Sequence, residues 1–261
     1  MAKQSGILRI EGTIAGISFY KTADGYFARE KSSLSRKRIY SDPSFQRTRE
    51  NASEFGTAAR MSKILIDVVR PVLKGSGDRR LFSRLVKTIL AIIKKDKTNI
   101  RGSRVLAEEN VKDLVGFDFN LNADIRSVVN FGIDKVQEKS PTERIYTFSK
   151  FRPIDAIKFP PGATHFKLAI MLISGDWLGE TRDAATGYGK ILPLNEEEIS
   201  PEIMIKPLAK ETKHEMVLLG IEFMQEVNGS YYSLKDGGYV SLSVLSFGKN
   251  GSEGGQVAAE V

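Results

Sequence analysis

The side chains with the widest range of chemistry are scarce in this chain. It holds two histidines, His165 and His214, and no cysteine, which excludes disulfides, thiolate metal sites and thiol catalysis. His165 lies among the apolar residues of an alternating segment, and His214 stands beside Glu215. Neither has the ligand spacing of a known metal site. We therefore interpret both as structural or surface histidines, and expect no metal, no cofactor and no catalytic residue.

A run of alternating polar residues is superficially similar to a calcium-binding loop. Its members are Asp118, Asn120, Asn122 and Asp124. The turn position that should be glycine is Ala123, and the twelfth position is Val129 instead of glutamate. The alternation instead predicts a strand over 117–121, with Phe117, Phe119 and Leu121 facing inward.

Three further motifs are better explained as structural elements than as catalytic or binding sites. Gly75-Ser76-Gly77 lacks the lysine and hydroxyl residue of a phosphate-binding loop and lies between two predicted helices, so we interpret it as a connector. Gly187-Tyr188-Gly189 predicts a turn, and Glu196-Glu197-Glu198 predicts a solvated loop. Trp177 is expected to pack at the rim of a β-sandwich, although it could also anchor a ligand or partner.

The most informative feature is a cluster of cations interleaved with aromatic residues. The candidate interaction residues are Arg29, Lys31, Arg36, Lys37, Arg38, Arg47, Arg49, Tyr20 and Tyr26. Phe27, Tyr40 and Phe45 lie between them. Cations with aromatic rings bind phosphates and stack bases, and arginine and tyrosine are also enriched at protein interfaces. Three interpretations therefore remain open: a solvated surface, a contact with another subunit, or a nucleic-acid interface.

Charge is divided unevenly along the chain. Residues 1–104 carry 23 Lys and Arg against 9 Asp and Glu, whereas the remaining residues carry 16 against 23. This asymmetry indicates an anionic partner for the N-terminal part. Nucleic acid, an acidic membrane surface or the acidic part of a neighbouring copy would each provide one.

Apolar periodicity predicts hairpins and then helices in the N-terminal part. Strands are expected at 7–10, 13–20 and 26–31, with a hairpin turn at Thr22-Ala23-Asp24-Gly25 and a basic linker over 32–40. Ser41-Asp42-Pro43 predicts a helix start, and the helix is expected to reach at least Gly56. Apolar residues continue to recur at helical spacing over 61–72, and further helices are expected at 78–93 and 104–114. The apolar faces of 61–72 and 78–93 are expected to pack as a helical hairpin.

The pattern changes to a period of two after Phe117. Strands are expected at 128–136, 144–151, 165–174, 203–208, 216–227, 230–234 and 239–247, with a turn at Asn228-Gly229. The predicted fold is α+β: an N-terminal β-hairpin and helical segment with an antiparallel β-sandwich. The predicted division is 1–115, 116–248 and a mobile Gly/Ser-rich tail at 249–261.

Targeting signals are not evident in the sequence. No stretch of eighteen apolar residues predicts a membrane span, and the N-terminus lacks the apolar segment of a Sec signal peptide. We expect the protein to be cytoplasmic or released by a route other than Sec.

Part of the sequence resembles a family of uncharacterised proteins from Bacteroidetes. The resemblance rests on Gly16–Lys21, Asp24–Tyr26, Arg29–Lys31 and the segment 43–55, which contains Arg47-Thr48-Arg49-Glu50-Asn51. A weaker resemblance covers 216–247. It implies membership of a family of unknown function, with no functional residues to carry over.

These observations favour a non-catalytic structural subunit that self-assembles into a homopolymeric filament, tube or other large assembly. Opposite charges in the two parts suit contacts between copies, for example between the basic cluster and Glu196–Glu198. The alternative is a nucleic-acid-binding protein that uses the basic cluster. An enzyme of unrecognised type is a third class, with no sequence feature in its favour.

Overall fold

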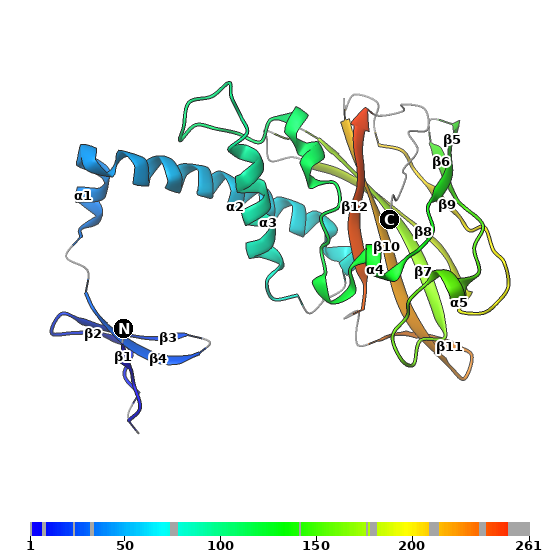
Figure 1. Cartoon of the computed structure of the whole chain (residues 1–261), viewed down its shortest axis with the longest axis horizontal. Helices are drawn as coiled ribbons and strands as arrows, with labels where there is room; N and C mark the ends of the chain where they lie inside the picture. Colours follow the sequence, from blue (N-terminus) through cyan, green and yellow to red (C-terminus); the bar gives the residue numbers. More distant parts are fainter. Residues whose placement is uncertain are drawn as a thin grey trace. The chain divides into compact units, whose positions relative to one another are not determined.

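The computed structural model describes residues 2–6, 9–22, 24–31, 34–73, 78–140, 142–175, 177, 182–208, 214–234 and 239–249 (Figure 1). The chain divides into two compact units, an N-terminal unit of residues 1–52 and a C-terminal unit of residues 53–261. The boundary predicted at 115/116 falls inside the C-terminal unit, where residues from both sides of it share a core. The predicted tail and Gly75-Ser76-Gly77 lie outside the described residues, except for Lys249 at the end of a strand.

The N-terminal unit begins with a four-stranded antiparallel sheet of order β1-β4-β3-β2. Its strands are β1 (Ala2–Lys3), β2 (Gly12–Ile14), β3 (Ile17–Thr22) and β4 (Gly25–Glu30). The single strand predicted at 13–20 is wrong, because Ala15 and Gly16 form a two-residue turn with φ of 48° and 81°. Such a turn reverses the chain and places Ile14 opposite Ile17. The predicted hairpin between β3 and β4 is confirmed.

Two short helical elements follow the sheet. Residues within the predicted basic linker instead form helix α1 (Arg36–Ser41), whose N-cap is the hydroxyl of Ser35. Asp42 then caps a 3₁₀ turn at Pro43–Phe45, which leads directly into the next helix. The sequence signal of Ser41-Asp42-Pro43 for a helix start is therefore confirmed, with Asp42 as the capping residue.

Helix α2 (Gln46–Leu73) continues through Gly56 and ends two residues after Pro71. Its buried residues recur every three or four positions: Ala58, Met61, Leu65, Val69 and Val72. Helix α3 (Leu81–Ile93) buries Leu81, Leu85, Val86, Ile89, Ile92 and Ile93. The predicted apolar faces of both helices are confirmed, and both belong to one core.

The C-terminal unit is built around a five-stranded antiparallel sheet, in which β10 pairs with β7 on one side and with β11 and β12 on the other (Figure 1). Its strands are β7 (His165–Gly175), β8 (Arg182–Pro193), β10 (His214–Val227), β11 (Ser230–Ser233) and β12 (Ser241–Lys249). The predicted turn at Asn228-Gly229 is confirmed, since both residues have positive φ.

A second sheet of three strands completes the sandwich. It has the order β5-β6-β9, from β5 (Ile133–Ser140), β6 (Glu143–Phe148) and β9 (Glu202–Ile205). Phe148 and Ile203 of this sheet share a core with Leu168, Ile170 and Ile221 of the five-stranded sheet. Short helices connect the elements: 3₁₀ turns at Glu108–Leu114 and Leu121–Ala123, α4 (Ile125–Val128) and α5 (Pro153–Ala156).

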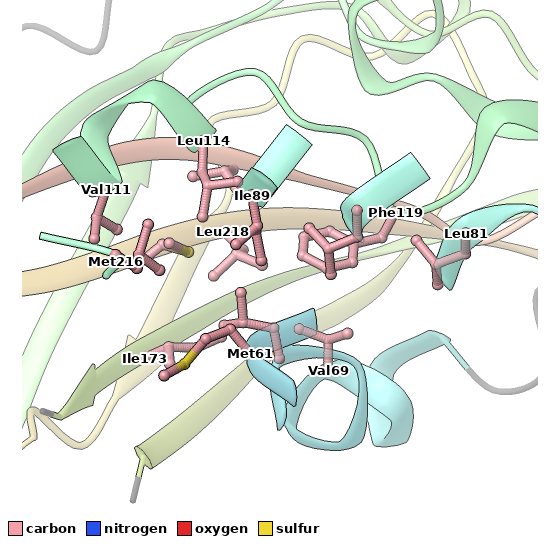
Figure 2. Close-up of a cluster of buried hydrophobic side chains, with 14 of the residues drawn as sticks. Met61, Val69, Leu81, Ile89, Val111, Leu114, Phe119, Ile173, Met216 and Leu218 are labelled. Atoms are coloured by element: carbon pink, nitrogen blue, oxygen red, sulfur yellow. The ribbon is translucent and has the colours of Figure 1, made fainter. Parts of the chain in front are cut away.

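The other face of the five-stranded sheet packs against the helices. Figure 2 shows Met61 and Val69 of α2 and Ile89 of α3 gathered with Ile173 and Met216 of the sheet. Alternate residues of β7 and β10 therefore enter two different cores, which explains their almost continuous burial. The predicted α+β fold with packed antiparallel sheets is confirmed.

Three local predictions in the C-terminal unit are also wrong. Gly187-Tyr188-Gly189 lies inside β8, a strand that the sequence did not indicate. The strand predicted at 128–136 begins only at Ile133, and Val128 is instead the last residue of helix α4. Phe119 is buried as predicted, but Leu121 begins a 3₁₀ turn and is 56% exposed. Across the described residues, no helix is long and apolar enough to span a membrane.

Candidate interaction surface

All nine candidate interaction residues lie in the N-terminal unit, but on different elements. Tyr20 is on β3, Tyr26 and Arg29 are on β4, and Lys31 follows directly. Arg36, Lys37 and Arg38 are on α1, whereas Arg47 and Arg49 are in the first turn of α2. Arg29 contacts Tyr20 within the sheet. Four of the helical candidates contact other residues of the helical elements: Arg36, Arg38, Arg47 and Arg49.

Strand register divides the sheet residues between two faces. Residues directly opposite each other in an antiparallel pair point to the same side, and the side alternates along a strand. One face, here called the isoleucine face, carries Ile14, Ile17, Phe19, Lys21, Tyr26, Ala28 and Glu30. The opposite face, here called the aromatic–cation face, carries Lys3, Thr13, Ser18, Tyr20, Phe27 and Arg29. The two predicted tyrosines are thus on opposite faces.

The aromatic–cation face holds a cross-strand pair of rings. Tyr20 lies directly opposite Phe27, with ring centroids 6.2 Å apart and an interplanar angle of 28°. The guanidinium of Arg29 lies 5.5 Å from the centroid of Tyr20. On the same face, Thr13 and Ser18 share a hydroxyl hydrogen bond of 3.2 Å. The face therefore combines half-buried rings, a cation and hydroxyl groups.

The isoleucine face carries Ile14 and Ile17 beside Glu30 at one end, and cations at the other. Ile14 and Ile17 lie opposite each other and are 57% and 42% exposed. At the other end, Tyr26 has the ammonium of Lys21 at 5.5 Å and the guanidinium of Arg9 at 5.0 Å from its ring centroid. None of the described residues from 2 to 52 is buried. A sheet without a buried side chain gains little stability from its own packing.

The cations of α1 are exposed, and its two arginines contact neighbouring rings. Arg36 lies 5.6 Å from the ring centroid of Tyr40, and Arg38 lies 6.0 Å from that of Phe45. Arg38 also reaches Asp42 at 3.4 Å. Hydrogen bonds from the hydroxyl and backbone of Ser44 hold the pKa of Asp42 below its ordinary value. The carboxylate of Asp42 is therefore already used as the N-cap of the 3₁₀ turn at Pro43–Phe45.

The two candidate arginines of α2 differ in how many of their donors are already used within the protein. Arg47 is exposed and pairs with Glu50 at 3.0 Å. Arg49 donates from Nη1 to the carbonyls of Ile39, at 2.7 Å, and Asp42, at 2.9 Å. Arg49 therefore ties α1 to the start of α2, and its guanidinium has fewer donors left for an external partner.

The histidines and the tryptophan of the C-terminal unit take part in its packing. His214 Nδ1 lies 2.6 Å from Glu108 Oε1, and its ring stacks on Phe247. His165 contacts the hydroxyl of Thr164 and the ring of Tyr231. Trp177 is 2% exposed and belongs to the core that helices α2 and α3 share with the five-stranded sheet. In the described part of the chain, no group of three or more His, Asp or Glu side chains is placed to hold a metal ion.

A buried ion pair in the sandwich was not indicated by the sequence. Arg144 of β6 donates to Glu215 of β10 at 2.5 Å and to Glu138 of β5 at 2.6 Å. Arg144 and Glu215 are 4% and 5% exposed. The sequence did contain a signal for it. Arg144 lies two and four positions before the buried Tyr146 and Phe148, so on a strand all three side chains point to the same side. The pair joins the two sheets and offers no open site.

The segment similar to a calcium-binding loop contains two carboxylates that interact with each other, those of Asp118 and Asp124. Burial first, and then the neighbouring Asp124, raise the pKa of Asp118 to about 6. Asn120 is used internally, because its amide donates to Val240 and its carbonyl accepts from Asn122. Asp124 caps helix α4 through the backbone N–H of Arg126. These interactions order a connection that runs beside β12.

Comparisons of the whole chain with protein-family models, with curated proteins and with solved structures find no match.

Proposed function

We propose that the protein is a non-catalytic structural subunit that self-assembles into a filament, tube or other large assembly. The N-terminal unit supplies one of the contacts between copies. The observation that carries the proposal is that this unit forms a four-stranded sheet in which no described side chain is buried. Sheets are stabilised by covering an apolar face, so this sheet is suited to a partner.

The isoleucine face is the part of the sheet that fits a second copy. Ile14 and Ile17 expose adjacent apolar surface, with Phe19 and Ala28 beside them on the same face. Two such faces packed against each other form a small sandwich with a shared core. This contact is isologous, because each copy uses the same patch, and by itself it joins two copies.

A larger assembly needs a second contact, and charge supports one. The N-terminal unit contributes exposed cations on α1, whereas the carboxylates outnumber the cations after residue 104. Attraction between the basic cluster and the acidic part of another copy is heterologous, so it can propagate. The candidate acidic partners of the basic cluster, Glu196, Glu197 and Glu198, are all exposed. Glu196 already pairs with Arg152 at 3.3 Å within the same chain.

The test is the assembly state of the full chain. Size-exclusion chromatography with light scattering, over a range of protein concentrations, should show species larger than one chain. Ile14→Lys should shift them towards smaller species, because it places a charge in the proposed shared core. Thr13→Lys is the matched control: it adds the same charge to the same edge strand, on the opposite face.

The outcomes separate the interpretations. Reduced assembly in Ile14→Lys with normal assembly in Thr13→Lys supports the isoleucine face as a contact. A strict monomer at every concentration would overturn self-assembly. Equal effects of both substitutions would overturn this face as the contact. Electron microscopy of the largest species then distinguishes a filament or tube from a closed oligomer.

Nucleic-acid binding by the basic cluster is the second candidate function. The specific observation in its favour is the pairing of stacked rings and cations on the aromatic–cation face. It uses the face of the sheet opposite to the isoleucines, so the two proposals are tested separately.

A further inference from the structure

We propose that the aromatic–cation face of the N-terminal sheet binds single-stranded nucleic acid. The inference does not rest on self-assembly, because the residues involved point away from the isoleucine face. It rests on the arrangement of Tyr20, Phe27, Arg29 and Lys3.

The near-parallel rings of Tyr20 and Phe27, with centroids 6.2 Å apart, are here called the aromatic platform. They lie on adjacent strands, directly opposite each other, and both are half-buried. Bases stack on aromatic side chains without regard to their identity, because every base has a π-face. The platform therefore suits unpaired bases. A duplex keeps its bases stacked inside and offers such a surface only its backbone.

Each ring of the platform has a cation next to it. Lys3 is directly opposite Phe27 on the neighbouring strand β1, and Arg29 lies over Tyr20. Lys31 follows Arg29 by two positions, immediately after β4. A strand of nucleic acid whose bases stack on the rings would bring its phosphates near these cations.

The distribution of acidic residues favours a polyanion on this face. The carboxylate of β4, Glu30, belongs to the isoleucine face. The described strand residues of the aromatic–cation face are lysine, arginine, threonine, serine, glycine, tyrosine and phenylalanine, with no acid among them. A phosphate backbone on this face would therefore not be repelled by any carboxylate of the described strand residues.

The experiment measures fluorescence anisotropy of a labelled oligo(dT) 20-mer with the full chain, at low and moderate salt. A mixed-sequence RNA of the same length and a DNA duplex are run in parallel. Both single strands should bind more tightly than the duplex, with affinity falling as salt rises. The variants are Phe27→Leu, Arg29→Glu and, as the matched control on the other face, Lys21→Glu.

Phe27→Leu keeps an apolar side chain in the strand but removes the ring, so circular dichroism should be unchanged. Its affinity for oligo(dT) should fall about tenfold. Arg29→Glu should weaken binding at least as much and reduce the salt slope by about one. Lys21→Glu should leave affinity within about twofold, because its charge change is on the opposite face and exposed charges are screened by salt.

Three results would overturn the proposal. The first is no binding of any single strand at low salt. The second is equal loss in Arg29→Glu and Lys21→Glu, which would show a response to net charge and not to this face. The third is unchanged binding in Phe27→Leu together with equal binding of poly-glutamate, which would assign the face to acidic protein. None of these results bears on the isoleucine face.

Discussion

Arg144 Nη1 lies 2.5 Å from Oε1 of Glu215, and Oε2 of the same carboxylate is buried and has no hydrogen-bond partner among the described residues. The two residues belong to different sheets of the sandwich, so their ion pair links the layers. Burial raises the pKa of Glu215 above its ordinary value, although Arg144 opposes this effect. Among the described residues, Arg144 is the cation that pairs with this carboxylate and favours its charged form inside the sandwich.

Replacing Arg144 by methionine should therefore be strongly destabilising. Methionine keeps an unbranched apolar side chain but leaves Glu215 as an uncompensated buried charge. Breaking a buried pair in this way costs about 3–5 kcal/mol in the free energy of unfolding. Urea denaturation at pH 8, followed by circular dichroism, measures the loss.

Arg152→Met is the control for this prediction. Arg152 is 48% exposed and pairs with Asp155 and Glu196 at the surface, so its loss should cost no more than about 1 kcal/mol. A raised carboxyl pKa favours the folded state below the ordinary glutamate pKa, and this effect is lost as pH rises through the folded value. The defect of Arg144→Met should accordingly shrink as pH falls. A loss no larger than that of Arg152→Met would contradict the role of the pair.

Helical periodicity and Asn-Gly turn chemistry could be predicted from the sequence because they are local. Leu85 and Ile89 repeat at helical spacing, and Asn228-Gly229 readily adopts positive φ. Ala15 at φ 48° could not be predicted, because alanine rarely adopts this conformation. Strand β8 escaped prediction because nearly all of its residues are half-buried or exposed and it contains two glycines.

The candidate interaction surface was predicted in composition but not in geometry. The sequence placed Tyr20, Tyr26 and Arg29 in one cluster. Strand register then separates Tyr26 from the other two, because Tyr20 faces Phe27 and Tyr26 faces Lys21. Register is a property of strand pairing and turn length, so composition alone does not reveal it.

The pH dependence of stability should contain a contribution from Asp118. Its pKa of about 6 in the folded protein exceeds the ordinary value of 3.8, chiefly because the group is buried. The folded state therefore binds an extra proton between these values. The associated stabilisation is fully present below pH 3.8 and is lost as pH rises through about 6. Asp118→Asn, which cannot ionise, should flatten this slope in urea midpoints measured from pH 4 to pH 8.

Two further variants make the Asp118 prediction specific. Asp124→Asn keeps the capping oxygen for Arg126 but removes the like charge, so it should lower the pKa of Asp118. Asp67→Asn removes an exposed carboxylate that pairs with Arg70 and should leave the slope unchanged. If the midpoints of Asp118→Asn follow those of the unmodified protein across the whole range, the titration belongs to another group.

Close packing of β8 on β9 predicts different tolerances for two neighbouring glycines. A Cβ on Gly187 would lie 2.6 Å from the carbonyl oxygen of Met204, and backbone would have to move. A Cβ on Gly189 would have its nearest neighbour, Ile203 Cγ1, at 3.4 Å. Neither glycine has a positive φ, so backbone strain does not distinguish them. Gly187→Ala should therefore lower the free energy of unfolding by about 1–3 kcal/mol through overpacking, whereas Gly189→Ala should change it by less than about 1 kcal/mol. Chemical denaturation of both variants checks this order, and equal stabilities would show that β8 and β9 do not pack this closely.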